Sequence, residues 1–276
     1  MNKTMPKPPP PKVSSIHFGP WKLTTKKSHI LPSKCTDACV ENGSGAKGEE
    51  NGTLCPFCNY AKNLALPHLP DMVFPENSLQ IEHEKGHGIE FNALDALKRV
   101  NINDGDVLKV AVTDVWSEAR ADLNISGSKA SFDWTFSSDY KGSVFGEGIQ
   151  VEPSDVKIDL EKLKEKEPLL FYDEVHLYED ELADHGCTTC TVKVRVMPSG
   201  FFALLRLYLR VDDVLVRVND TRLYYENGKQ YIIREYMSRE SKVADIKVPR
   251  CFWGDPNEIS KFLPVVQTND ELLSFH

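Results

Sequence analysis

A run of alternating apolar and polar residues between 192 and 236 constrains the fold of this chain most. Residues 192–196 alternate strictly, and in 205–211 the leucines fall on one side with arginines and a tyrosine on the other. The pair Asn227-Gly228 follows, and both residues tolerate the positive φ of a tight hairpin. Period-two strands joined by tight turns form antiparallel sheets. We therefore predict an α+β fold of mostly antiparallel β-sheets, arranged like a sandwich, with a few short peripheral helices.

Other segments fit the same fold. Residues 78–91 alternate around two central glycines, which predicts a second hairpin, and Asn92 occupies an N-cap position before a short amphipathic helix. We also expect a strand pair in 131–144, a strand in 108–114 and a helix in 114–122. The predicted organisation is a disordered proline-rich tail, a single regulatory domain with a flexible cysteine-bearing insert, and a C-terminal tail, over residues 1–14, 15–266 (insert 33–60) and 267–276.

Composition excludes several classes of protein. The chain has 276 residues with 33 basic and 41 acidic side chains, a net charge of −8. This balance argues against nucleic-acid binding, which requires a basic face. No apolar run approaches the roughly 20 residues of a membrane helix, and the N-terminus lacks the apolar core of a signal peptide. We expect a monomer in the cytoplasm, with the nucleus as a second location, and reduced cysteines.

Four cysteines occur as two close pairs separated by a polar, glycine-rich loop: Cys35, Cys39, Cys55 and Cys58. Four thiolates in such pairs are able to hold zinc tetrahedrally. The alternative is that they are incidental cysteines of a variable insert. We expect no other cofactor, and four thiolates would leave no open position for catalysis.

Two further motifs suggest chemistry but have unfavourable surroundings. His83-Glu84-x-x-His87 matches the zinc-protease pattern, which requires a helix, whereas the flanking residues alternate as strands do. Cys187-x-x-Cys190 resembles a redox pair, but it opens a predicted strand and not a helix. The sequence therefore offers no positive support for an enzyme.

The strand that contains Val218 has a mixed face. With a period of two, an apolar side chain, a carboxylate, a guanidinium and a phenol project to one side: Val218, Asp220, Arg222 and Tyr224. Such a row can hold an extended peptide and grip a terminal carboxylate through the arginine. The alternative is an ordinary exposed strand. Seven acidic residues within 167–186 add a possible docking strip, or a solvated sheet face paired with the basic residues of the next strands.

Long segments of the chain resemble one known family, the TOR signalling pathway regulator-like family. The similar segments are FGPWKLT (18–24), GIEFNALDALK (88–98), DWTFSSDYKG (133–142), EVHLYEDELADHG (174–186), residues 194–226, REYMSRES (234–241) and PNEISKFLP (256–264). They cover most of the chain from Phe18 to Pro264. The cysteine-bearing insert and the H-E-x-x-H match are not features of this family.

The resemblance implies a non-enzymatic regulator. Its members bind the catalytic subunits of type 2A-like serine/threonine protein phosphatases, restrain their activity and act in TOR and stress signalling. The resemblance also implies a groove that receives the phosphatase's C-terminal tail, with contacts from Asp95, Ile158, Val218 and Asp220. Arg222 and Tyr224 join this set by strand periodicity alone.

Overall fold

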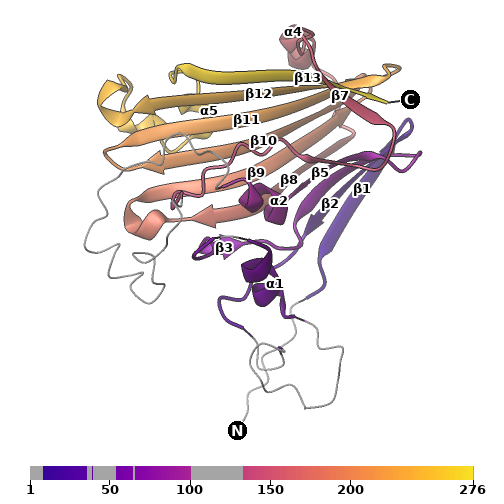
Figure 1. Ribbon diagram of the computed structural model, residues 1–276. Helices are drawn as coiled ribbons and strands as arrows, with labels where there is room; N and C mark the ends of the chain where they lie inside the picture. Colours follow the sequence, from indigo (N-terminus) through magenta and orange to yellow (C-terminus); the bar gives the residue numbers. More distant parts are fainter. Residues whose placement is uncertain (1–8, 36–38, 40–53, 65, 101–132, 276) are drawn as a thin grey trace, which may run out of the picture.

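The structure is a computed structural model that describes residues 9–35, 39, 54–64, 66–100 and 133–275. Its strands form two sheets, and the strand pairs are antiparallel (Figure 1). The smaller sheet has the order β1-β2-β4-β5-β6, with strands β1 (Lys12–Phe18), β2 (Trp21–Lys27), β4 (Ser78–His83), β5 (Gly88–Asn92) and β6 (Ser143–Phe145). The prediction of a mostly antiparallel fold is confirmed.

The larger sheet contains the strands that the alternation predicts. Its order is β3-β8-β9-β10-β11-β12-β13-β7. The Asn227-Gly228 hairpin joins β11 to β12, and Gly228 has the expected positive φ of 82°. The strands are β3 (Met72–Val73), β7 (Ile149–Pro153), β8 (Phe171–Asp180), β9 (Gly186–Met197), β10 (Gly200–Val211), β11 (Leu215–Glu226), β12 (Tyr231–Lys242) and β13 (Val265–Phe275).

The helices within the described part of the chain are short. Asn92 caps α2 by accepting a hydrogen bond from the Asp95 N–H at 2.8 Å, as predicted. No helix in this part of the chain has the length and apolar character needed to cross a bilayer. The helices are α1 (Pro56–Asn63), α2 (Ala93–Lys98), α4 (Leu160–Lys164) and α5 (Pro256–Ile259), with 3₁₀ turns η4 (Leu182–Asp184), η5 (Val243–Asp245) and η6 (Arg250–Phe252).

The two sheets share one core, so each buries one face. Trp21 and Ile81 of the smaller sheet lie in the same buried cluster as Leu205, Leu207 and Leu223 of the larger sheet. Helix α2 belongs to this cluster through Leu97. Helix α5 packs in a separate cluster on the opposite side of the larger sheet (Figure 1). We call the side of the larger sheet that points away from the smaller sheet the outer face.

Both predicted tails are too long. Strand β1 begins at Lys12, inside the expected tail, and pairs with β2 through a turn at Gly19. Residues 267–275 are not a tail, because they lie within β13 and pair with β12. Leu273 is fully buried, so the two-residue alternation of apolar side chains there, although weak, reflects a real strand.

The predicted strand pair in 131–144 is wrong. Residues 133–142 contain no strand, and only β6 begins at the end of this segment. The segment instead crosses the inner side of β11, where its polar groups bond with strand side chains. Asn219 donates to the Ser138 carbonyl at 3.0 Å and Thr221 donates to the Tyr140 carbonyl at 3.2 Å. Hydroxyl-rich sequence here satisfies buried polar groups and does not form a ladder.

Some expectations fall on residues that the structure does not describe. The expected strand 108–114 and helix 114–122 lie outside the described residues. The same holds for most of the insert 33–60, although helix α1 begins within it at Pro56.

Candidate functional site

The outer face of β11 carries the predicted row of side chains. Val218, Asp220, Arg222 and Tyr224 all project from this face, as the period of two requires. Their exposure differs from the prediction. Val218 is 0%, Asp220 1% and Tyr224 4% exposed, and only Arg222 is partly open.

Val218 does not offer an open apolar seat. It packs in one cluster with Trp253, Ile259 and Leu263, which belong to the segment after β12. The Tyr208 hydroxyl fastens this segment by donating to the Trp253 carbonyl. We call residues 243–263 the Trp253 cover. The prediction that Val218 receives a partner's side chain is not supported in this conformation, because the chain's own side chains fill the position.

Asp220 is held by three arginines. The Arg206 guanidinium donates to both of its carboxylate oxygens, at 2.6 and 2.8 Å. Arg239 and Arg222 lie 3.7 and 3.9 Å from one of the same oxygens. Loss of one partner from such a buried bidentate pair would leave an uncompensated charge on the sheet face. Asp220 therefore orients arginines, and it is not the exposed acceptor that the sequence suggested.

Ile158 lies at the other end of the outer face. It is 4% exposed and packs against Tyr224 and Ile233. Its N–H donates to a carboxylate oxygen of Glu235 at 2.8 Å. We call residues 156–164, which include α4, the Ile158 cover. The structure thus brings Ile158 to the same face as Val218, and each is buried under or within a cover.

Between the two covers, a strip of the outer face stays partly exposed. Among the described residues, the three guanidinium groups of the strip lie within 4.0 Å of the carboxylates of Asp220 and Glu235. A cavity of about 220 Å³ adjoins the strip above β8, β9 and β10. Arg206 and Lys193 line it. The partly exposed residues of the strip are Leu204, Arg206, Arg222, Met237 and Arg239.

Asp95 is separated from this strip by the larger sheet. It lies on α2, on the side of the shared core. Burial pushes the pKa of Asp95 up, but hydrogen bonds from Ser143, Lys98 and Asn92 outweigh burial and hold the pKa below its ordinary value. The implied contacts therefore do not form one groove, since Asp95 lies on one side of the sheet and Val218 and Asp220 on the other.

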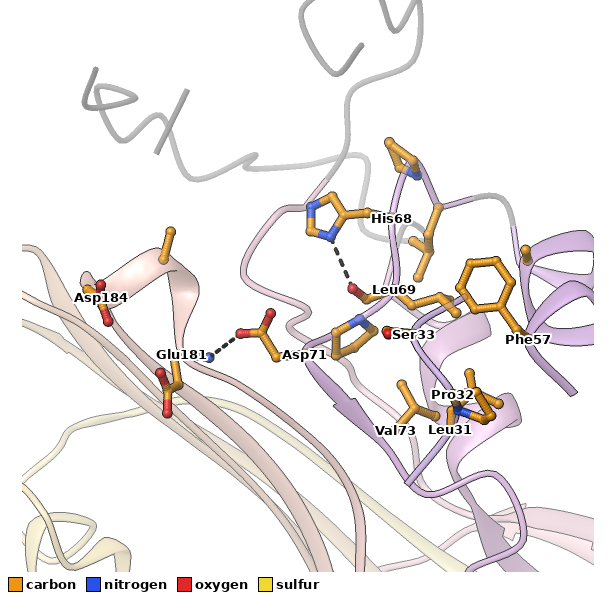
Figure 2. A pocket seen from close by; sticks show the side chains of 15 residues that line it. Leu31, Pro32, Ser33, Phe57, His68, Leu69, Asp71, Val73, Glu181 and Asp184 are labelled. Carbon is orange, nitrogen blue, oxygen red and sulfur yellow. Dashed lines mark hydrogen bonds between the residues drawn. The ribbon is translucent and has the colours of Figure 1, made fainter. Parts of the chain in front are cut away.

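A pocket that sequence reasoning missed lies beside α1. Its volume is about 640 Å³, and prolines and apolar side chains from α1, β3, the loop between them and the segment before α1 form most of its wall (Figure 2). Asp71, Glu181 and Asp184 add acidic groups, and the Glu181 N–H donates to the Asp71 carboxylate at 3.1 Å. The spacing of Pro67 and Pro70 before a strand was the available signal, but proline pairs also occur in ordinary loops.

Several acidic side chains of the strip predicted in 167–186 form hydrogen bonds or ion pairs within the protein. Asp173 bonds with Lys27 and Thr25, and Glu174 pairs with Lys193 at 3.2 Å. Asp180 is 1% exposed and accepts from two backbone N–H groups. Pairing with the neighbouring basic strand is therefore seen for Glu174, whereas Asp173 and Asp180 bond elsewhere in the fold and Glu181 and Asp184 remain exposed at the pocket.

The four cysteines of the insert come together. Their sulfur atoms all lie within 4.8 Å of one another. Cys39, Cys55 and Cys58 are buried and form a small cluster beside Phe57. Burial and hydrogen bonding among the thiols raise the pKa of Cys35. The convergence is what the zinc prediction requires, and occupancy by zinc stays a prediction.

The H-E-x-x-H match is a hairpin and not a helix. His83 ends β4, His87 precedes β5, and their rings stack at 4.7 Å with an interplanar angle of 7°. Both rings pack against Trp21 in the core. Burial lowers the pKa of each histidine. These are core side chains, and they do not have the placement of a zinc-protease site.

The second C-x-x-C pair is split across the sheet. Because Cys187 and Cys190 are three residues apart in β9, they project from opposite faces. Burial raises the pKa of Cys187 and raises that of Cys190 to about 12. Neither thiol favours the thiolate that disulfide exchange requires, so the redox interpretation is not supported.

This two-sheet chain belongs to the TIP41-like family, whose model matches residues 72–247. The family predicted from the sequence motifs is thereby confirmed. The chain is 47% identical to a TIP41-like protein of Rattus norvegicus and 46% identical to one of Homo sapiens, each over 94% of this chain and 89% and 88% of the relative. It is 33% identical to a protein of Saccharomyces cerevisiae named type 2A phosphatase activator TIP41, over 95% of this chain and 75% of that protein.

Proposed function

We propose that this chain is a non-enzymatic regulator that binds the catalytic subunit of type 2A-like serine/threonine protein phosphatases in the cytoplasm. The observation that carries the proposal is the similarity, along 95% of the chain, to a yeast protein named as an activator of type 2A phosphatase. The split C-x-x-C pair and the buried histidines do not have the placement of a redox site or a zinc-protease site.

The sign of regulation needs its own measurement. The family resemblance implied restraint of the phosphatase, whereas the yeast relative's name says activator. Dephosphorylation of a phosphopeptide by the purified catalytic subunit, with and without this protein, decides between the two. A rate that stays the same at saturating concentration would contradict regulation by direct binding.

We further propose that the phosphatase's C-terminal tail binds the partly exposed strip of the outer face through its terminal carboxylate. Arg222 is the group best placed to receive it. Its guanidinium lies 3.9 Å from carboxylate oxygens of both Asp220 and Glu235, beyond hydrogen-bond distance, and its side chain is 22% exposed. Arg206, in contrast, already donates to Asp220 and Asn257. A carboxylate near Arg222 would gain charge-assisted hydrogen bonds.

A synthetic peptide of the catalytic subunit's last residues tests this site by fluorescence anisotropy. We expect Arg222→Gln to weaken binding about 10- to 100-fold, because a hydrogen bond to a charged group contributes about 1.5–3 kcal/mol. Amidation of the peptide's terminus should weaken binding of the wild type by a similar factor and have little further effect on the variant.

Arg210→Gln is the matched control. Arg210 projects from the same face of β10 and is 31% exposed, but it pairs with Asp212 beyond the strip. Equal binding of the free and amidated peptides would contradict the proposal that the terminal carboxylate binds at Arg222. If the intact catalytic subunit is still pulled down in that case, the proposed regulator role stands with a different contact surface.

A further inference from the structure

We propose that Cys35, Cys39, Cys55 and Cys58 bind one structural zinc ion, which fastens helix α1 to the chain segment before it. This inference is independent of phosphatase binding. The TIP41-like family match begins at residue 72, after all four cysteines.

The sulfur positions fit a tetrahedral ion. A zinc–sulfur bond of about 2.3 Å places the sulfurs of a regular tetrahedron about 3.8 Å apart. The Cys35 sulfur lies 3.8 Å from that of Cys55 and 3.3 Å from that of Cys58. No pair of sulfurs in this group is at the roughly 2.05 Å of a disulfide, so no disulfide joins these four cysteines. The set is therefore arranged around a common centre and not as two cross-links.

Backbone groups around the sulfurs favour thiolates. The Cys55 N–H points at the Cys39 sulfur at 3.3 Å, and the Cys58 N–H points at the Cys55 sulfur at 3.5 Å. Hydrogen bonds to the charged form stabilise it. Cys55 is also the N-cap of α1, so its sulfur lies at the positive end of the helix. A divalent cation would neutralise the charge that these groups help to form.

The ligand set selects the metal. Four sulfurs in a tetrahedron suit zinc or iron, and they leave no position for water or substrate. We commit to zinc in a structural role. The pairs Cys35/Cys39 and Cys55/Cys58 are separated by 15 residues in the sequence, from 40 to 54, so one ion bound by all four would link the two pairs directly.

The ion also supports a wall of the larger pocket. Helix α1 contributes Phe57 and Ala61 to the pocket, and Phe57 packs against the cysteine cluster as well. At its other side, α1 enters the core through Tyr60, whose hydroxyl donates to the Pro75 carbonyl at 3.1 Å. Zinc would fix the N-terminal end of α1, and Tyr60 fixes the middle.

Elemental analysis of the full-length protein, expressed with zinc and iron both supplied, tests the assignment. We expect one zinc per chain in the wild type. The double variant Cys39→Ser/Cys55→Ser should fall to background, whereas Cys251→Ser, which removes an exposed cysteine of another segment, should keep the full amount. Iron in place of zinc, no metal in the wild type, or a Cys55–Cys58 disulfide in mass spectrometry without reductant would overturn the proposal.

Hydrogen exchange tests the structural role without any variant. Removal of zinc from the wild type by a strong chelator should speed amide exchange in α1, leave β10 and β11 protected, and be reversed when zinc is added back. Cobalt substitution should give the absorption of tetrahedral thiolate coordination. Unchanged exchange in α1 after full metal removal would contradict the fastening role.

Discussion

Asp220 and Arg206 form a bidentate pair at 2.6 and 2.8 Å on the outer face, where the carboxylate is 1% and the guanidinium 13% exposed. Arg239 and Arg222 depend on the same carboxylate for their charge balance. Its removal leaves three arginines close together without a central counter-charge. The residue therefore acts first on stability, and any effect on partner binding follows from the positions of the arginines.

We expect Asp220→Ala to lower the free energy of unfolding by about 3–5 kcal/mol, because breaking a buried ion pair leaves an uncompensated charge. Urea denaturation followed by circular dichroism measures this. Asp212→Ala is the control, since Asp212 pairs with Arg210 at 49% exposure and should change stability by no more than about 0.5 kcal/mol. Equal free energies of unfolding for the two variants would show that the ion pairs of Asp220 do not contribute to stability.

Val218 and Arg222 project from the same strand face but differ in their exposure to solvent. The period of two places both on the outer face, and this placement is confirmed. Exposure, however, depends on what packs above each residue. The Trp253 cover buries Val218, whereas the Arg222 side chain stays 22% exposed, and the alternation of residues along the strand predicts neither outcome.

At the scale of elements, β13 changes the interpretation of the C-terminus. Residues 265–275 pair with β12 on one edge and with β7 on the other. They join β7 and β12, which are separated by the 77 residues from 154 to 230, and Leu273 and Phe275 reach the shared core. The segment is part of the fold and not an appendage.

Leu273→Ala tests this assignment. We expect a loss of about 2–5 kcal/mol of stability, because the side chain is fully buried and its removal leaves a cavity. Val266→Ala, in the same strand but at a position 60% exposed, should be nearly neutral. Thermal unfolding of the two variants measures the difference, and similar melting temperatures would mean that β13 is not docked as described.

The segment 133–142 shows that strand-like residues do not always form a strand. Its aromatic and hydroxyl residues resemble a strand, but their backbone does not pair with a sheet. Phe136 has a φ of 54° and is fully buried, so the chain turns there to insert its side chain into the core. Propensity favours strands for such residues, and tertiary packing overrides it.

At the scale of the whole molecule, His83 and His87 couple stability to pH. Both are buried in the core beside Trp21, and burial lowers their pKa below the ordinary 6.5. The unfolded chain therefore binds more protons than the folded chain below about pH 6.5, and protonation favours unfolding. The stability from neutral histidines is present above this pH and is lost as the pH falls through the folded-state pKa.

We expect the free energy of unfolding to fall between about pH 7 and pH 5 more steeply for the wild type than for His87→Gln, which removes one titrating group. Urea denaturation at several pH values measures the two slopes. His29→Gln is a control outside the core, and it should keep the wild-type slope. A slope in His87→Gln that matches the wild type would mean that His87 does not contribute to acid destabilisation.

The arrangement of the two sheets also separates the contacts that the family resemblance implied. Asp95 lies on the core side of the larger sheet, and Ile158, Val218 and Asp220 lie on the outer face. The hydrogen-bonded strands of the larger sheet therefore separate a peptide on the outer face from Asp95. On the outer face, the Arg222 guanidinium lies 3.9 Å from carboxylate oxygens of Asp220 and Glu235, beyond hydrogen-bond distance, and it is the group on which the proposed tail site depends.

The sequence alone determined the antiparallel strands from β9 to β12, the hairpin turn at Gly228, the α2 cap at Asn92 and the family of the chain. Those features depend on neighbours in the chain, or on motifs that a period of two or a turn dipeptide encodes locally. Only the tertiary structure decided that Trp253 covers Val218, that three arginines surround Asp220, and that four cysteines meet beside α1. These contacts depend on how strands and loops pack against one another, which neither strand periodicity nor a turn dipeptide encodes, and this packing decides whether a side chain is buried or exposed.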